Sequence, residues 1–282
     1  MSGRPGHRIG LDLKPRLRQL FSPLLPKGRA GILAAYELLT TRARDGQRLS
    51  ALAHMVLSTP ELRDAYAALL SGIRLSVSFG SGKSILVTST QPNEGKTTVA
   101  SCLAIAASLS GQTVLLIDGD LRRPSLASAA GIANGVGFSE ILEGQAETSD
   151  SIYLVEVFEA NRGAGPLSVM GAGGKSPEFL PRVDWCRART TFQSISQRFG
   201  LVIFDSPPIL AANDALLLAG IVDGVLLVVG AGSADRSEVR RAKEQLDPLG
   251  TPLIGAVLNQ FDPKIHGRAN QPYLGYDLDA RR

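Results

Sequence analysis

A lysine and two threonines follow Gly95, at the point where an apolar run gives way to a helix-like segment. Residues 84–98 read SILVTSTQPNEGKTT, the order expected of a buried strand, a short loop and a helix start. A helix start offers unpaired backbone N–H groups and a positive dipole end to phosphate. Lys96 can reach the β- and γ-phosphates, and the Thr97 hydroxyl can bind Mg²⁺. The segment predicts a phosphate-binding loop whose nucleotide-contacting residues are Asn93, Glu94, Gly95, Lys96, Thr97 and Thr98.

The loop departs from the phosphate-loop pattern at its first position. The pattern G-x-x-x-x-G-K-S/T has glycine six residues before the lysine, and this chain has Thr90 there. An ordinary strand-to-helix turn with a surface lysine is therefore an alternative on this segment alone.

Two later apolar segments end in aspartate. Residues 113–124 read TVLLIDGDLRRP, and residues 201–208 read LVIFDSPP. Because the carboxyl ends of parallel strands meet at one edge of a sheet, Asp118, Asp120 and Asp205 are expected beside Lys96. A buried, unpaired carboxylate is costly, and Mg²⁺ with its waters is a suitable partner. The pattern predicts a nucleotide site with Mg²⁺ held by Thr97, Asp118 and Asp205.

The remaining chain alternates strand-like and helix-like segments. This alternation predicts an α/β fold with a doubly wound, mostly parallel sheet over residues 61–262, preceded by an extension at 1–60 and followed by a tail at 263–282. Helices are expected at 97–110, from Ser176 intermittently to Arg198, at 212–220 and at 235–249, and strands at 224–230 and 252–258.

Charge is unevenly distributed along the 282 residues. The net charge is +4, and residues 1–31 carry seven basic residues against one acid, Asp12. Such a segment suits an anionic membrane surface or an acidic partner, and a flexible basic tail is an equal alternative. No nucleic-acid-binding motif accompanies the charge, so we expect no nucleic acid partner.

Membrane spans and metal-binding cysteines are not expected. The N-terminus has no apolar core of signal-peptide length, and the most apolar stretch, 211–232, is interrupted by Asn213, Asp214 and Asp223. The two cysteines and three histidines lack metal-ligand spacing.

The segments TSTQPNEGKTT, LLIDGDLRRP and LVIFDSPP together resemble the Walker A, A′ and B motifs of bacterial tyrosine kinases of capsule and exopolysaccharide biosynthesis. The resemblance extends through residues 137–142, 214–217 and 257–259 and covers roughly 64–262. It implies a P-loop NTPase-type fold that uses ATP and Mg²⁺. This family tolerates a residue other than glycine at position 90.

The resemblance also implies roles for individual residues. Lys96 would stabilise the transferring phosphoryl group, Thr97 would ligate Mg²⁺, and Asp205 would hold the ion through water. Asp118 and Asp120 would shape the metal shell, and one of them would take the proton of a tyrosine hydroxyl. Asn259 matches an adenine-contacting position, or is a strand-end turn residue. Arg122 and Arg123 would receive a substrate acid or lie in a solvated turn.

Two departures from the family concern assembly and phosphorylation. Family members carry Glu-x-x-Arg-x-x-Arg before the catalytic domain for ring assembly, but here Asp64 is followed by Ala67 and Leu70 in place of both arginines. This predicts a monomer or a small oligomer. The family's tail carries several tyrosines, and this tail offers Tyr273 and Tyr276 as phospho-acceptors.

Three functions are therefore compatible with the sequence. The first is a tyrosine autokinase that regulates polysaccharide polymerisation and export together with a transmembrane co-polymerase. The second is a nucleotide-binding, non-kinase subunit of the same apparatus. The third, a positioning ATPase of the Min and Par kind, is less favoured because those proteins carry an extra lysine that residues 90–94 lack. The expected location is cytoplasmic, peripheral to the inner face of the cell membrane.

Overall fold

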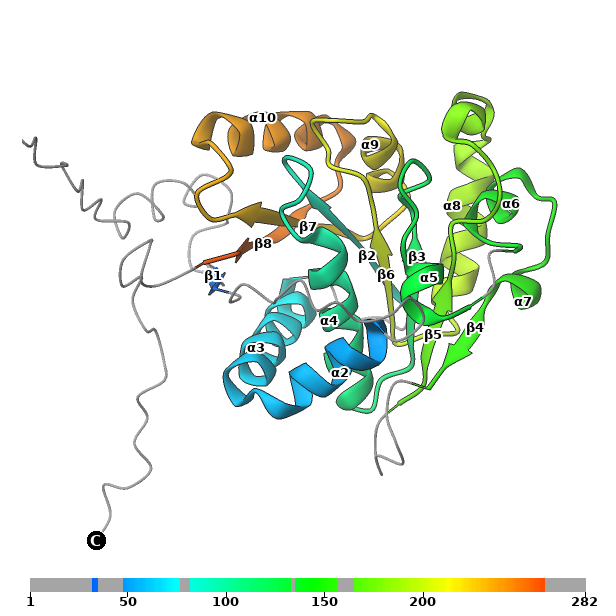
Figure 1. Cartoon of the computed structure of the whole chain (residues 1–282). Coiled ribbons are helices and arrows are strands. Elements are labelled where there is room, and N and C mark those ends of the chain that lie inside the picture. The colour runs from blue at the N-terminus through cyan, green and yellow to red at the C-terminus, as the bar shows by residue number, and fades with distance from the viewer. Residues whose placement is uncertain (1–31, 35–47, 77–81, 133–134, 157–164, 262–282) are drawn as a thin grey trace, which may run out of the picture.

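A mostly parallel sheet forms the centre of the molecule (Figure 1). The computed structural model describes residues 32–34, 48–76, 82–132, 135–156 and 165–261. Residues 1–31 with their basic side chains, and the tail tyrosines Tyr273 and Tyr276, lie outside the described residues. Among the described residues the sheet has eight strands in the order β1-β8-β7-β2-β6-β3-β5-β4. Their bounds are β1 Ile32–Ala34, β2 Lys83–Ser89, β3 Val114–Asp118, β4 Tyr153–Val155, β5 Leu167–Met170, β6 Leu201–Asp205, β7 Gly224–Gly230 and β8 Leu253–Asn259.

Neighbouring strands run parallel except for β4, which pairs antiparallel with β5 at one edge. The helices are α2 Arg48–Ser58, α3 Pro60–Ser76, α4 Lys96–Leu109, α5 Leu126–Ala130, α6 Phe138–Glu143, α7 Thr148–Ser151, α8 Trp185–Ser196, α9 Asp214–Ala219 and α10 Arg236–Leu246, with 3₁₀ turns η1 Pro177–Arg182 and η2 Asp247–Leu249. This arrangement confirms the predicted doubly wound α/β fold.

Each face of the sheet is covered by its own hydrophobic cluster. Along β2, Ile85 and Val87 belong to the cluster beneath α2, α3, α4 and α5, whereas Leu86 belongs to the cluster beneath α8, α9 and α10. Alternate side chains of a strand point to opposite faces, so a strand covered on both sides must be apolar throughout. The continuous apolar runs in the sequence therefore correspond to the central strands.

Helix α2 lies inside the packed domain. The sequence places residues 48–60 in the extension, but Leu49, Leu52, Ala53 and Val56 of α2 are buried in the same cluster as α4. Their spacing of three and four residues forms one apolar helix face. The extension therefore supplies a helix that packs beside the helix of the phosphate-binding loop.

Two helix boundaries differ from the predicted ones. The segment from Ser176 to Arg198 forms the 3₁₀ turn η1 and a separate helix α8, which Asp184 caps by accepting hydrogen bonds from the N–H groups of Cys186 and Arg187. Helix α10 ends at Leu246, and the remaining residues to Leu249 form η2, since Pro248 cannot continue the α-helical hydrogen bonding. None of the described helices is long and apolar enough to cross a membrane.

Candidate nucleotide-binding site

The loop between β2 and α4 favours glycine at position 95. Gly95 has φ of 85°, a left-handed conformation that favours glycine. A Cβ atom there would lie 2.0 Å from Asn259 Nδ2, which is closer than any van der Waals contact. The backbone conformation therefore favours the glycine of the G-K-T-T sequence, and any larger residue would also displace the Asn259 side chain.

Glu94 braces the loop from inside. Its Oε2 accepts hydrogen bonds from the Thr90 hydroxyl and the Gln91 N–H, both at 2.8 Å. Its Oε1 accepts a hydrogen bond from the Gly230 N–H at 2.9 Å, at the end of β7. Glu94 is 1% exposed, so these charge-assisted hydrogen bonds replace its hydration. Thr90 thus has a structural task at the position where the phosphate-loop pattern has glycine.

Asn259, at the end of β8, holds the same loop from the other side. Its Nδ2 donates a hydrogen bond to the Glu94 carbonyl oxygen at 2.8 Å. The following residue, Gln260, donates from Nε2 to the Asn93 carbonyl oxygen at 2.8 Å. Asn259 is the last residue of β8, as the strand-end alternative predicts, and its side chain ties the loop to the sheet; contact with adenine stays a prediction.

The predicted charged residues meet at the carboxyl edge of the sheet. Asp118 and Asp205 are register partners on the adjacent strands β3 and β6. Lys96 Nζ lies 3.2 Å from Asp120 Oδ2, and their side chains are 17% and 6% exposed. The four residues predicted to be catalytic, Lys96, Asp118, Asp120 and Asp205, therefore come together as parallel-sheet geometry requires.

Both carboxylate oxygens of Asp118 accept hydrogen bonds from the backbone of the following residues. Its Oδ2 accepts hydrogen bonds from the N–H groups of Ser125 at 2.8 Å and Leu126 at 2.9 Å, and its Oδ1 accepts one from Asp120 at 3.2 Å. Burial raises the pKa of Asp118 to about 6, and these N–H donors oppose the rise. The carboxylate shapes the loop that carries Asp120.

Asp205 is the buried carboxylate that lacks partners. It is 1% exposed, and among the described residues neither carboxylate oxygen has a hydrogen-bond partner of good geometry. Burial raises its pKa to about 7, although Lys96 and the Thr97 hydroxyl lower it in part. Buried polar atoms are rarely left unsatisfied, and such an atom points to an absent ion or water.

A magnesium ion fits this position. Mg²⁺ is bound by one or two carboxylates together with waters and substrate phosphates rather than by a full protein cage. The described residues hold no group of three or more His, Cys, Asp or Glu side chains suited to a metal. Asp205 and the Thr97 hydroxyl are the donors that would hold the ion, whereas Asp118 already uses its oxygens.

Arg122 has a defined partner inside the protein. Its Nε donates to Asp214 Oδ2 at 2.7 Å and its Nη2 to Asp214 Oδ1 at 3.0 Å, a bidentate pair between the loop after β3 and the start of α9. The Arg122 side chain is 52% exposed and lies in a turn, so the solvated-turn alternative holds for Arg122, with Asp214 as its partner. The Arg123 N–H donates to Asp120 Oδ1 at 3.0 Å.

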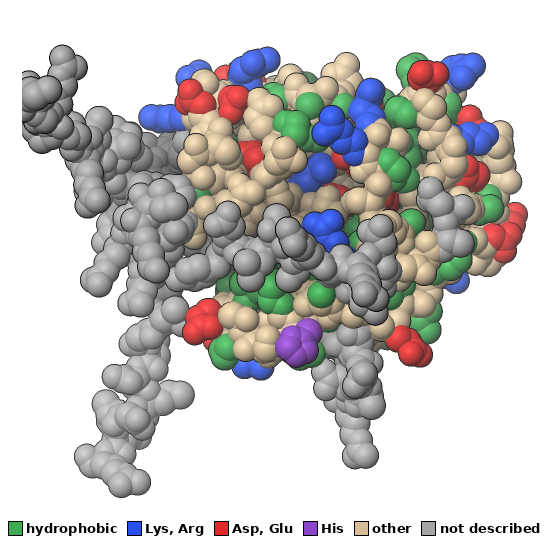
Figure 2. Space-filling model, in the orientation of Figure 1, with side chains coloured by type: hydrophobic (Ala, Val, Ile, Leu, Met, Phe, Trp, Pro, Cys, Tyr) green, Lys and Arg blue, Asp and Glu red, His purple; other side chains and the backbone are tan. Residues whose placement is uncertain are grey.

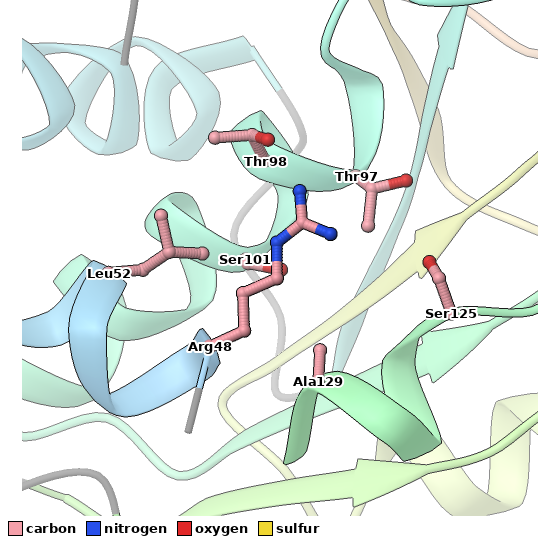
Figure 3. A pocket seen from close by; sticks show the side chains of 7 residues that line it. All are labelled: Arg48, Leu52, Thr97, Thr98, Ser101, Ser125 and Ala129. Atoms are coloured by element: carbon pink, nitrogen blue, oxygen red, sulfur yellow. The ribbon is translucent and has the colours of Figure 1, made fainter. Parts of the chain in front are cut away.

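The sequence does not predict that Arg48 lies near the phosphate-binding loop. Arg48, the first residue of α2, lines a pocket with Thr97 and Thr98 of α4 (Figure 3). Figure 2 shows several Lys and Arg side chains grouped on this face of the molecule. The spacing of apolar residues in α2 indicates that this segment is a helix. It does not indicate which part of the protein the helix packs against.

Known proteins resemble this chain in both sequence and fold. Residues 85–276 match the CobQ/CobB/MinD/ParA nucleotide binding domain. Tyrosine-protein kinase YwqD of Bacillus subtilis (strain 168) is 31% identical over 207 residues, which cover 72% of this chain and 84% of YwqD. Tyrosine-protein kinase CpsD of Streptococcus pneumoniae serotype 4 is 30% identical over 202 residues, covering 71% and 85%. The kinase domain of Escherichia coli tyrosine kinase ETK superposes with a TM-score of 0.69 and 26% identity, covering 86% of this chain and 93% of that domain.

Proposed function

Because this chain belongs to the CobQ/CobB/MinD/ParA nucleotide-binding family and, within it, to the bacterial tyrosine kinases, we propose that it is an ATP-dependent tyrosine autokinase regulating exopolysaccharide or capsule polymerisation and export. The observation that carries the proposal is the unpartnered, buried Asp205 beside Lys96 and Thr97. An Mg²⁺–phosphate group supplies the charge that this carboxylate lacks.

Each residue then has a task in phosphoryl transfer, which depends mainly on positioning and electrostatics. Lys96 would neutralise charge on the β- and γ-phosphates, and Thr97 and Asp205 would hold Mg²⁺, whose charge would screen that of the phosphates. Asp118 keeps the loop after β3 in place. Asp120 is the better candidate base for the tyrosine hydroxyl, because among the described residues its Oδ2 is held only by Lys96, a partner that an entering phosphate would take over, whereas both oxygens of Asp118 accept backbone hydrogen bonds.

A non-kinase, nucleotide-binding subunit of the export apparatus is the second candidate. It is favoured by Leu70, which occupies an arginine position of the ring motif and is 6% exposed in the core. A ring in which each subunit presents its tail to a neighbour lacks these arginines here. A Min- or Par-type positioning ATPase is the third candidate, since the family includes both names, but the loop residues 90–94 contain no lysine.

The partner and the location belong to the proposal as well. The partner would be a transmembrane polysaccharide co-polymerase, and the protein would lie at the cytoplasmic face of the membrane. The basic residues within 1–31 would strengthen this attachment, because each basic residue near an anionic surface contributes about 1 kcal/mol. Deleting residues 1–31 is expected to reduce binding to anionic vesicles while nucleotide binding stays unchanged.

The test of the main proposal is phosphotyrosine formation in purified protein incubated with ATP and Mg²⁺. We expect a signal that is lost in Lys96→Met and in Tyr273→Phe/Tyr276→Phe, with nucleotide binding retained in the double Phe variant. A signal that survives the double substitution places the acceptor at Tyr36, Tyr66 or Tyr153. No signal under conditions where ATP binds would support the non-kinase subunit instead.

A further inference from the structure

Arg48 lies beside the phosphate-binding loop although the sequence places it in the extension at 1–60. It is the first residue of α2 and lines a pocket whose other walls are the first turns of α4 and the start of α5. Figure 3 shows its guanidinium group directed across this pocket toward Thr97 and Thr98. The pocket is lined by Arg48, Leu52, Thr97, Thr98, Ser101, Ser125 and Ala129.

The position of Arg48 is fixed by the residues that follow it. Leu49 and Leu52 are 1% and 6% exposed, and they belong to the hydrophobic cluster that also contains α4. Because the next turn of α2 is anchored in the core, the Arg48 backbone stays within reach of the α4 start. Only the long side chain itself needs to be ordered by a ligand.

The chemistry of the pocket is that of an anion site. Among the described residues, its polar lining consists of the Arg48 guanidinium and the hydroxyls of Thr97, Thr98, Ser101 and Ser125, and it includes no carboxylate. Among the described residues Arg48 takes part in none of the ion pairs. Arg122, at the opposite side of the same loop region, is by contrast neutralised by Asp214. Arg48 is therefore a cation near the phosphate loop that has no ion-pair partner in the part of the chain that the structure describes.

We propose that Arg48 binds the α- and β-phosphates of the nucleotide, so that the N-terminal extension completes the nucleotide site within the same chain. The inference rests on the proposed nucleotide-binding function. Guanidinium groups bind phosphate oxygens with two parallel hydrogen bonds. Lys96, which would contact the β- and γ-phosphates, and its ion-pair partner Asp120 are not part of the Arg48 pocket, whereas Thr98, further along the helix, is. Arg48 therefore acts on the phosphates that ATP and ADP share.

The experiment measures the dissociation constants of Mg²⁺–ADP and Mg²⁺–ATP, and ATP turnover, at constant ionic strength. Arg48→Gln should weaken the binding of both nucleotides by a similar factor of roughly tenfold, the effect of losing hydrogen bonds from a charged group. Turnover at saturating ATP should change much less. Arg48→Lys keeps the charge but not the planar fork, so it should restore part of the affinity. Arg63→Gln, an exposed arginine on the neighbouring helix α3, is the matched control and should bind like the unmodified protein.

Several outcomes would overturn the inference. Unchanged affinity for ADP in Arg48→Gln excludes contact with the shared phosphates. A fall in turnover with unchanged ADP affinity assigns Arg48 to the γ-phosphate or the acceptor instead. Unfolding curves of each variant show whether α2 stays folded. If Arg48→Gln is destabilised, only the nucleotide affinity of Arg48→Lys is used to test the inference.

Lys96→Met separates this inference from the proposed function. If the unmodified protein binds nucleotide and Lys96→Met does not, the proposed site holds whatever the Arg48 variants show. If the unmodified protein binds neither nucleotide, both the proposed function and the role of Arg48 are wrong.

Discussion

Lys96 Nζ lies 3.2 Å from Asp120 Oδ2 across the edge of the sheet. The lysine of the phosphate-binding loop is thus paired with an acid from the loop after β3. A phosphate group that enters the site competes with this carboxylate for the lysine. The ion pair with Asp120 holds the Lys96 ammonium group at the edge of the sheet, where both side chains are largely buried. Breaking this ion pair costs free energy, which reduces the net free energy of nucleotide binding.

Asp120→Asn should separate binding from chemistry. Removing the carboxylate frees Lys96 and takes a negative charge away from the phosphates, so ADP should bind at least as tightly as to the unmodified protein. ATP turnover or phosphotyrosine formation should fall by about 10²–10³-fold, because a proton acceptor and an electrostatic contribution are lost. Parallel binding and turnover measurements check both effects, and full turnover with weaker ADP binding would contradict the proposed role.

Stability without nucleotide should depend on the ionisation of Asp205. Its pKa is about 7 in the fold and 3.8 ordinarily, so the folded protein holds more protons than the unfolded chain between these pH values. Its contribution to stability is therefore full below about pH 4 and is lost as the pH rises through 7. Asp205→Asn should stabilise the nucleotide-free protein at pH 8 by roughly 1–3 kcal/mol, the cost of a buried unsatisfied group. Urea unfolding at pH 5 and pH 8 measures this, with exposed Asp64→Asn as the control.

The same carboxylate should make nucleotide binding pH-dependent. Mg²⁺ needs the ionised form of Asp205, so the affinity for Mg²⁺–ADP should increase between pH 6 and pH 8 and then level off. Calorimetry in buffers of different ionisation enthalpy should detect proton release on binding. Asp205→Asn should bind more weakly and lose this pH dependence; if the slope persists in the variant, another group is responsible.

Loosening the loop brace should reduce nucleotide affinity. Glu94→Gln removes the negative charge that accepts hydrogen bonds from Thr90, Gln91 and Gly230. Leaving one buried donor without its acceptor costs about 1–3 kcal/mol of stability. We expect weaker ADP binding and a lower unfolding midpoint, since the loop no longer holds its shape before phosphate arrives. Thr90→Ser keeps the hydroxyl and serves as the control, with affinity close to that of the unmodified protein. A Glu94→Gln variant with unchanged ADP affinity would show that the loop does not need this brace.

Restoring the ring-motif arginines should not restore a ring. Leu70 is 6% exposed in the core, so Leu70→Arg buries a charge without a partner and should destabilise the fold by on the order of 3 kcal/mol or more. Ala67 is exposed on α3, and Ala67→Arg should stay within about 0.5 kcal/mol of the unmodified protein. Sedimentation should show a monomer or a small oligomer for the unmodified chain, and a stable ring of about eight subunits, the size suggested by the family resemblance, would refute this.

The sequence alone determined the parts of the site that depend on the main chain. Apolar runs that end in acids predict parallel strands whose ends share one edge, and Gly95 before Lys96 predicts the phosphate loop, because strand periodicity and glycine conformation are local properties. These local properties therefore predict that Lys96, Asp118, Asp120 and Asp205 lie together.

Only the tertiary structure decided which polar atoms are paired. Asp118 and Asp205 look alike in the sequence, yet Asp118 accepts three backbone hydrogen bonds and Asp205 none of good geometry among the described residues. Arg122 is neutralised by Asp214, 92 residues later in the chain, while Arg48 reaches Thr97 and Thr98 through the packing of α2 on α4. Such pairings depend on contacts between distant segments, and these arise only when the whole sheet and its helices have assembled.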